Sequence, residues 1–322
     1  SIMIKNALLL GGSGFVGTWI ANRLSKAGVN VTIPTRRRER NKANIMLPQV
    51  EVVEANINDE AQLVELMRGQ DVVINLVGVL HDHDSQIPYG KGFGAAHVEL
   101  PKKIVAAMKQ AGVRRLVHMS ALGAEVGGCS EYIRSKGEGE AIVMAAAKDL
   151  DVTVFCPSVI FGIGDNFLNT FAKVLKIAPS FASGGMQAKF QPVYVGNVAD
   201  AFVSCIENRD TFGQRYELCG PKVYTLRELV EYVRDLTGQQ HKKVKELSDL
   251  WAYLQAGILW LLPNPPMSPD NLRSMDKDNV ASADGQTYPG WNPAPLEAIA
   301  PTYLGKVAPK SKLDDFRYHA GR

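Results

Sequence analysis

Cysteine is scarce in this sequence, with four residues among 322. The cysteines lie far apart, and none belongs to a C-x-x-C pair or stands at metal-ligand spacing from a histidine. This scarcity excludes a disulfide scaffold and predicts reduced thiols in a cytoplasm-like compartment. The two closest histidines, His81 and His83, alternate with aspartates, so we interpret this stretch as a solvated loop and expect no metal site. The four cysteines are Cys129, Cys156, Cys205 and Cys219.

A strong charge of either sign is also absent. The net charge is +3, and hydrophobic and charged residues make up 46% and 21% of the chain, an ordinary balance for a globular protein. Nothing in this balance calls for nucleic acid or an acidic membrane as a partner. The longest apolar stretch, residues 250–262, is shorter than the ~20 residues that span a bilayer. The chain opens directly on a strand-like pattern, so we expect no signal peptide and a cytoplasmic location.

The first half of the chain alternates between strand-like and helical patterns. Residues 72–77 form a continuous apolar run, which is typical of a strand buried on both faces. Alternating strands and helices predict an α/β fold: a Rossmann-type, doubly wound parallel sheet with right-handed crossovers. The expected strands are 7–10, 29–34, 50–54, 72–77, 116–119 and 152–156, and the expected helices are 16–27, 59–68, 100–111 and 132–148.

The pattern changes after Pro157, and the length of the chain favours a second, smaller lobe. We expect the nucleotide-binding domain to comprise residues 1–165 and returning segments at about 190–220. The short apolar runs 193–194 and 216–218 are predicted to rejoin the main sheet. Residues of about 166–189 and 221–322 would form a smaller C-terminal substrate lobe, with no clear pattern after about Pro301.

A glycine-rich turn follows the first strand and opens the first helix. It reads Leu10-Gly-Gly-Ser-Gly-Phe-Val-Gly17, which is the context that a dinucleotide-binding turn requires. Gly11 would allow the tight turn, Gly14 would let the backbone approach a pyrophosphate, and Gly17 would let helix and strand pack closely. The free N–H groups of the helix would then bind the phosphates. The predicted pyrophosphate-binding residues are Gly11, Ser13, Gly14, Phe15, Val16 and Gly17.

The end of the second strand indicates which dinucleotide is bound. A site for NAD usually has an acidic residue there, which binds the ribose 2′-hydroxyl. Here a basic cluster follows Thr35, and a guanidinium suits a 2′-phosphate through charge-assisted hydrogen bonds. We therefore predict NADP(H) in preference to NAD(H), with Arg36 as the first candidate and Arg37 as the second. The alternative is a solvated basic loop.

Tyr132 and Lys136 are four residues apart and lie on one face of a predicted helix. A nearby ammonium can lower the pKa of a tyrosine and make its phenol a usable proton donor or acceptor. Ser120 ends the preceding strand and could orient a carbonyl or a hydroxyl. The predicted catalytic residues are therefore Ser120, Tyr132 and Lys136, although a Y-x-x-x-K pattern by itself is usually just a helix face.

Together with the glycine turn, these motifs resemble those of the extended or atypical short-chain dehydrogenases/reductases. Further matches are Asn75-Leu-Val-Gly78 and Pro157-Ser-Val-Ile-Phe-Gly162. The chain is most similar to the branch related to the nucleotide-binding accessory subunit of respiratory complex I. The runs that carry this similarity are Leu116-Val-His-Met-Ser-Ala-Leu-Gly-Ala124, Phe190-Gln-Pro-Val-Tyr-Val195 and Tyr216-Glu-Leu-Cys-Gly-Pro221.

The resemblance implies a role for each matching residue. Tyr132 would be the acid/base, and Lys136 would hold the nicotinamide ribose and tune Tyr132. Two departures concern the substrate side: Cys156 stands where many extended members have arginine, and Asn197 where aspartate is usual. The remaining residues that would line the cofactor are Asn56 and Ile57 near adenine, Leu76, Val77 and Gly78 along it, and Pro157, Ser158 and Val159 facing the nicotinamide.

Three functions are compatible with these features. The first is an NADP(H)-dependent oxidoreductase acting on an unknown carbonyl substrate, quinone-like or lipid-like. The second is a non-catalytic nucleotide-binding subunit or assembly factor linked to respiratory complex I or quinone metabolism. The third is a nucleotide-sugar epimerase or dehydratase, which Cys156 weakens.

The apolar segment 250–262 contains two tryptophans. We interpret it first as a core helix of the second lobe. Alternatively, it is a surface-active helix or pocket wall that contacts a membrane, a respiratory complex or a lipid-like substrate. In that case the protein would lie peripherally at the inner face of a membrane.

Overall fold

The computed structural model describes residues 3–36, 47–263 and 265–305. The described chain divides into two compact units. The first comprises the residues up to Cys156 together with Val198–Glu217 and Gln286–Pro289. The second comprises Pro157–Asn197, Leu218–Gly285 and the residues from Gly290 on.

A seven-stranded sheet forms the centre of the first unit, with the order β11-β6-β5-β4-β1-β2-β3. All pairings from β6 to β3 are parallel, and the strand order reverses between β1 and β4, which pair directly. This confirms the predicted Rossmann-type fold. The strands are β1 (Asn6–Leu10), β2 (Asn30–Thr35), β3 (Val50–Glu54), β4 (Val72–Asn75), β5 (Arg115–Met119), β6 (Asp151–Pro157) and β11 (Gln214–Leu218).

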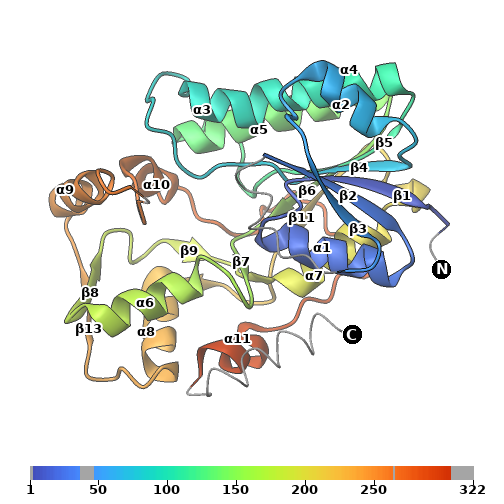
Figure 1. Cartoon of the computed structure of the whole chain (residues 1–322). Helices are drawn as coiled ribbons and strands as arrows, with labels where there is room; N and C mark the ends of the chain where they lie inside the picture. The colour runs from blue at the N-terminus through green and yellow to red at the C-terminus, as the bar shows by residue number, and fades with distance from the viewer. Residues whose placement is uncertain (1–2, 37–46, 264, 306–322) are drawn as a thin grey trace. The chain divides into compact units, whose positions relative to one another are not determined.

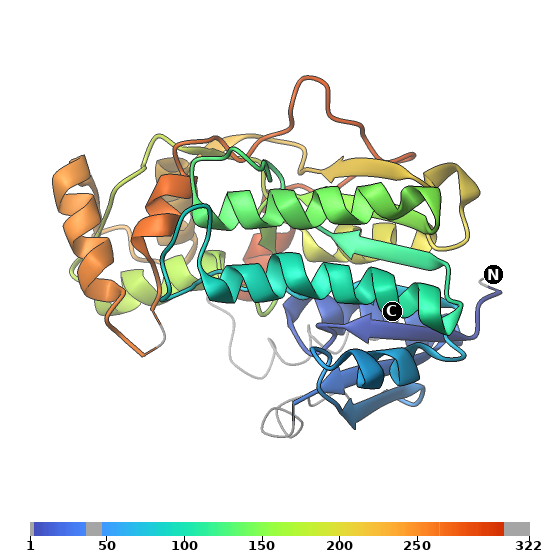
Figure 2. The ribbon, with the colours of Figure 1, turned by 90° about the horizontal axis from the view of Figure 1, so that it is seen from above.

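Helices cover both faces of this sheet (Figure 1). Helices α2 (Glu60–Met67), α4 (Leu100–Ala111) and α5 (Glu131–Ala145) lie on one face, and their apolar side chains form one buried cluster with the strands. Helices α1 (Phe15–Lys26) and α7 (Val195–Ser204) lie on the other face. Figure 2 shows α4 and α5 side by side along the sheet.

Local sequence explains where these helices begin and end. The Asp59 side chain caps α2 by accepting the N–H groups of Ala61 and Gln62. The Ser130 hydroxyl caps α5 by accepting the N–H of Ile133. Helix α4 ends at Gly112, whose φ of 77° places it in the left-handed region that favours glycine.

One helical stretch was not expected from the sequence. A short helix α3 (Lys91–Gly94) continues through a π-helical turn (Ala95–Glu99) into α4, which the pattern had predicted to begin at Leu100. Such turns are rare and are often found at functional sites.

Residues 216–218 rejoin the main sheet within β11, as predicted. The same prediction for residues 193–194 is wrong, because this segment forms β10 (Val193–Tyr194) and pairs in parallel with β7 (Ile160–Phe161). A two-residue apolar run does not specify its partner strand, since its burial can be satisfied by either sheet.

The second unit contains short two-stranded sheets packed with helices. Its core gathers apolar side chains of α6, α8 and α11. Its further elements are β8 (Ser180–Ser183), β9 (Lys189–Phe190), β12 (Tyr224–Thr225), β13 (Lys243–Glu246), α6 (Leu168–Ile177), α8 (Leu226–Leu236), α9 (Asp249–Leu259), α10 (Pro269–Ser274) and α11 (Leu296–Leu304). Two short 3₁₀ turns, Ala146–Lys148 and Arg209–Thr211, belong to the first unit.

The interpretation of segment 250–262 as a core helix is wrong. Helix α9 forms there, but its large side chains are exposed while Ala252 and Ala256 are buried. The small residues therefore face the unit, and hydrophobicity alone did not reveal this orientation. Within the described residues, no helix is long and apolar enough to cross a membrane.

Candidate functional site

The glycine turn joins β1 to α1 at the point where the strand order reverses, and its backbone is as tight as predicted. Gly11 has a φ of 79°, and a Cβ there would lie 3.0 Å from the backbone of both Leu76 and Val77. A Cβ on Gly17 would lie 2.5 Å from the Cα of Gly12. Only glycine fits at these two positions, because one packs against the end of β4 and the other against the turn itself.

The middle of the turn is open. Ser13 and Gly14 are exposed, Phe15 is half-buried and Val16 is buried. No side chain caps α1 at Gly14, and its first turn carries no acidic residue. The first N–H groups of α1 are therefore available to an anion together with the positive end of the helix dipole. This cradle fits the pyrophosphate of a dinucleotide.

A hollow of about 580 Å³ lies beyond the carboxyl ends of β2 and β3. Asn56 and Asn58 belong to the loop that forms its floor. Asn56 Oδ1 accepts the Asn58 N–H at 3.0 Å, and Gln62 Oε1 accepts the Asn56 N–H at 2.9 Å. These bonds fix the backbone on either side of Ile57, which is half-buried against the sheet core. The lining residues are Arg36, Glu54, Ala55, Asn56, Asn58 and Gln62.

Arg36 is exposed and borders this hollow directly after β2. The strand end carries Thr35 in place of an acidic residue, while Glu54 at the end of β3 brings a carboxylate to the same hollow. Arg37, the second candidate for the 2′-phosphate, lies outside the described residues.

Lys136 lies where the ends of β4 and β5 meet helix α5. Its ammonium Nζ donates to the Met119 carbonyl at 3.1 Å. A Cβ on Gly78 would lie 3.8 Å from the same Nζ. A Cβ on Gly11 would lie 3.0 Å from the nitrogen of Val77, which precedes Gly78, so the backbone of these two residues connects the glycine turn with Lys136. Burial lowers the pKa of Lys136 to about 8.

The loop after β4 is held by Asn75. Its Oδ1 accepts the Val77 N–H at 3.2 Å, and its amide nitrogen lies 3.2 Å from Nδ1 of His118. Burial lowers the pKa of His118 to about 3, so the ring is neutral and its Nδ1 can accept from the amide. This pair fixes the backbone that leads to Gly78.

Tyr132 lies one helical turn before Lys136, packed edge-on against two aromatic rings. Its ring centroid is 5.5 Å from that of His97 and 6.1 Å from that of Phe93. Burial raises the pKa of Tyr132 to about 12. We expected the neighbouring ammonium to lower this pKa, but in this structure the loss of solvation dominates. The phenol is therefore protonated at neutral pH.

His97 was missed by the sequence reasoning, although it connects the loop after β4 with helix α5. Its Nε2 accepts the Val79 N–H at 3.0 Å, so Nδ1 carries the proton and donates to Ser135 Oγ at 2.8 Å. Ser135 Oγ in turn donates to the Tyr132 carbonyl at 3.0 Å. Burial lowers the pKa of His97 to about 2, which keeps the ring neutral. The sequence pattern did not predict the π-helical turn, so no local signal indicated that His97 belongs to the site.

The backbone of α5 approaches the π-helical turn closely. A Cβ on Gly139 would lie 1.9 Å from the His97 carbonyl oxygen, so only glycine permits this contact. The contact brings the backbone of α5 directly against the π-helical turn that carries His97.

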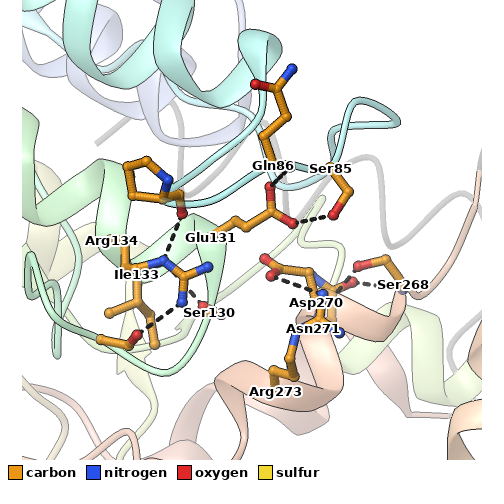
Figure 3. Close-up of polar contacts among 12 residues, drawn as sticks. Ser85, Gln86, Ser130, Glu131, Ile133, Arg134, Ser268, Asp270, Asn271 and Arg273 are labelled. Atoms are coloured by element: carbon orange, nitrogen blue, oxygen red, sulfur yellow. Dashed lines mark hydrogen bonds and ion pairs between the residues drawn. The ribbon is translucent and has the colours of Figure 1, made fainter.

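The loop after Val79 is bound to the start of α5 (Figure 3). Glu131 accepts the Ser85 hydroxyl at 2.7 Å and the Gln86 N–H at 3.0 Å. Arg134 donates to the Pro88 carbonyl at 2.6 Å, and Asp82 accepts the Phe93 N–H at 2.9 Å. The loop that we expected to be merely solvated is thus anchored beside Tyr132, and the D-x-D spacing of Asp82 and Asp84 is the signal that could have indicated it.

Ser120 follows β5, but its hydroxyl is buried beside the Cys156 thiol and forms no well-aligned hydrogen bond. Cys156 donates to Glu140 at 3.0 Å, and Glu140 also accepts from Arg215 at 3.0 Å. Burial raises the pKa of Cys156 well above its usual range, so this thiol is not a nucleophile at neutral pH. Direct contact between Ser120 and a substrate would need the side chain to rotate.

Pro157, Ser158 and Val159 begin the second unit directly after Cys156. The Ser158 hydroxyl donates to the Gln191 carbonyl, and the Val159 N–H donates to Asn279 at 2.9 Å. Within the described residues there is no cluster of side chains that could hold a metal ion.

Comparison with known proteins agrees with this geometry. The family model "NAD dependent epimerase/dehydratase family" matches residues 7–219. The 40 kDa subunit of mitochondrial NADH-ubiquinone oxidoreductase from Neurospora crassa is 30% identical over 92% of this chain and 78% of its own length. Subunit 9 of the mitochondrial NADH dehydrogenase (ubiquinone) 1 alpha subcomplex from Mus musculus is 30% identical over 90% of this chain and 77% of its own.

A solved structure with a similar fold is the dTDP-glucose 4,6-dehydratase DesIV from Streptomyces venezuelae, with a TM-score of 0.66 and 20% identity. The match covers 76% of this chain and 84% of the DesIV chain. The chain therefore belongs to the NAD dependent epimerase/dehydratase family of extended short-chain dehydrogenases/reductases, in the branch that includes these two mitochondrial subunits.

Proposed function

We propose that this protein is an NADP(H)-dependent oxidoreductase that reduces a carbonyl of a quinone-like or lipid-like substrate. The observation that carries the proposal is the Tyr132–Lys136 pair on α5, with Lys136 Nζ against the end of β5 and beside Gly78. The backbone of Val77 and Gly78 connects this pair with the glycine turn. The apolar substrate class is suggested by relatives whose names include ubiquinone.

When bound at the glycine turn, the dinucleotide would supply the hydride that reduces the carbonyl carbon. The Tyr132 phenol donates its proton to the carbonyl oxygen, so that the product is an alcohol and the tyrosine is left as a phenolate. A phenol with a pKa of about 12 holds its proton until negative charge develops on the substrate oxygen. The Lys136 ammonium stabilises that phenolate and binds the nicotinamide ribose, while His97 and Ser135 hold the Tyr132 backbone.

This function can be tested by following NADPH oxidation with panels of short-chain quinones and apolar ketones. UDP-glucose and dTDP-glucose in the same panel test the nucleotide-sugar alternative. Turnover of a quinone or ketone supports the proposal, whereas conversion of a nucleotide sugar alone would overturn it.

Arg36 is proposed to select NADP(H) through the 2′-phosphate. We expect Arg36→Ala to weaken NADPH binding about 10- to 100-fold, because hydrogen bonds to a charged group contribute ~1.5–3 kcal/mol and ~1.4 kcal/mol is tenfold in affinity. NADH binding should change less than about threefold. Arg68→Ala is the control, since Arg68 is exposed on the same unit and pairs with Glu65 at 2.9 Å. Fluorescence titration measures both affinities, and equal losses for the two cofactors would contradict the role.

The pH dependence of the reduction should follow Lys136. Its pKa is lowered to about 8, so the ammonium is present below pH 8 and is lost as the pH rises through 8. We expect kcat/KM to be level at pH 6–7 and to fall about tenfold per pH unit well above 8. In Lys136→Arg the guanidinium stays charged, so any remaining activity should show no such fall. A wild-type profile that stays level to pH 9.5 would contradict the assignment.

A second candidate function is favoured by the two mitochondrial relatives, which match this chain over nine-tenths of its length. In that case the protein is a nucleotide-binding subunit or assembly factor linked to respiratory complex I, located peripherally at the inner face of a membrane. Co-purification with a detergent-extracted respiratory complex, with no turnover in the panel, would support this candidate over the first.

A further inference from the structure

Helix α9 presents its large apolar side chains to solvent. We define its apolar stripe as Leu250, Trp251, Leu254, Ile258 and Leu261, the last lying just beyond the helix. At 3.6 residues per turn, these positions share one side of the helix. Their exposed fractions range from 50% for Leu254 to 83% for Leu261. Full burial of one such side chain stabilises by ~1.5–3 kcal/mol, so a stripe left in water is a sign of an interaction surface.

The opposite side of α9 fixes this orientation. Ala252 and Ala256 are buried against Leu272 of α10. Gln255 donates to the Ala182 carbonyl at 3.1 Å, which turns its polar end toward β8. Because a small-residue face and a hydrogen bond hold the helix onto the unit, the stripe cannot turn inward without breaking these contacts.

A shallow apolar hollow of about 300 Å³ lies along the stripe. Trp251, Leu254 and Ile258 of the stripe contribute to it. Between Leu250 and Leu262 the chain has no charged side chain, so the stripe offers almost no hydrogen-bonding groups. A protein interface normally forms about one hydrogen bond per 100–200 Å², and the stripe itself supplies almost none.

Lysines lie next to the stripe on the chain. Lys243 and Lys245 are exposed on one face of β13, while Val244 between them packs into the core of the unit. Glu246 and Asp249 are the exposed acids closest to the stripe in sequence, and Asp249 is the first residue of α9.

We propose that the apolar stripe of α9 docks onto a membrane surface, with Lys243 and Lys245 of the preceding strand β13 bound to anionic lipid headgroups. An amphipathic helix lying in the interface buries its apolar side chains at the headgroup–acyl boundary, and tryptophan favours that depth. Each lysine near an anionic surface adds ~1 kcal/mol. Helix α9 has 11 residues and cannot span a bilayer, which needs ~20, so it lies along the surface. This contact does not depend on catalysis.

Vesicle flotation tests the proposal with the full-length protein. We expect it to float with vesicles of phosphatidylcholine containing ~30 mol% phosphatidylglycerol, and about tenfold less with pure phosphatidylcholine. Brominated acyl chains should quench tryptophan fluorescence in the bound protein. The triple variant Leu250→Ser/Leu254→Ser/Ile258→Ser should lose binding at least tenfold, and Lys243→Glu/Lys245→Glu should lose the preference for anionic vesicles.

The control is Ile87→Ser/Val126→Ser, which removes two exposed apolar side chains of the first unit and should bind like the wild type. NADPH binding by every variant reports that the first unit is folded, and circular dichroism reports the secondary structure of the whole chain. Absence of wild-type binding to either vesicle, or equal binding by the triple variant, would overturn the proposal. The proposal would also be overturned if the wild type forms a dimer that does not float with vesicles and the triple variant cannot form this dimer.

Discussion

Replacing Tyr132 by phenylalanine should abolish carbonyl reduction while leaving NADPH binding intact. The substitution removes only the hydroxyl, so the ring contacts with Phe93 and His97 remain. Loss of a positioned proton donor costs about 10²- to 10⁴-fold in rate. The measurement is kcat on the best substrate of the panel, together with the dissociation constant for NADPH.

The matched control is Tyr253→Phe, which removes the same atom from an exposed tyrosine of α9. It should retain wild-type turnover. A Tyr132→Phe variant that turns over within twofold of the wild type would remove Tyr132 from the mechanism. If neither the wild type nor any variant turns over, the second candidate function is favoured instead.

Gly14→Val should eliminate dinucleotide binding without unfolding the protein. In the ligand-free turn a Cβ on Gly14 would meet only the Gly11 carbonyl oxygen, at 3.5 Å, which is ordinary contact. The valine side chain would, however, occupy the space through which a pyrophosphate approaches the N–H groups of α1. Loss of two hydrogen bonds to a charged group, each ~1.5–3 kcal/mol, predicts at least ~100-fold weaker binding of NADPH and NADH alike.

Gly127→Val provides the comparison, because Gly127 is exposed and a Cβ there would meet nothing within 4 Å. Both variants should melt within a few degrees of the wild type, and only Gly14→Val should fail to bind. Gly17 is unsuitable for this experiment, since its Cβ would collide with Gly12 and the fold itself would change. Tight NADPH binding by Gly14→Val would contradict the placement of the pyrophosphate.

Much of the first unit was predictable because its signals are local. Apolar runs predicted each central strand, and the spacing of Gly11, Gly14 and Gly17 predicted a turn whose close contacts the structure confirms. The resemblance to extended short-chain dehydrogenases/reductases was also confirmed, by a family match over residues 7–219. The roles of Tyr132 and Lys136 stay predictions.

Other features depend on contacts between residues distant in sequence. His97 is positioned by a π-helical turn that packs on Gly139, and no pattern in the adjacent sequence predicts that turn. The pKa of Tyr132 rises because Phe93 and His97 help to enclose it, which the Y-x-x-x-K spacing does not encode. Helix α9 was predicted to be a helix, but only the packing of Ala252 and Ala256 reveals which side faces water.

The return of residues 286–289 to the first unit determines when the nucleotide-binding unit can be completed during synthesis. Tyr288 packs on Phe155 and Tyr216 with ring centroids 5.4 and 5.2 Å away, and the Glu217 N–H donates to the Gln286 carbonyl. A ribosome adding ~5–20 residues per second must therefore make most of the second unit before these rings are covered. A chain that stops shortly after β11 would contain every dinucleotide-binding motif and still expose an aromatic face, so it should aggregate unless a chaperone holds it.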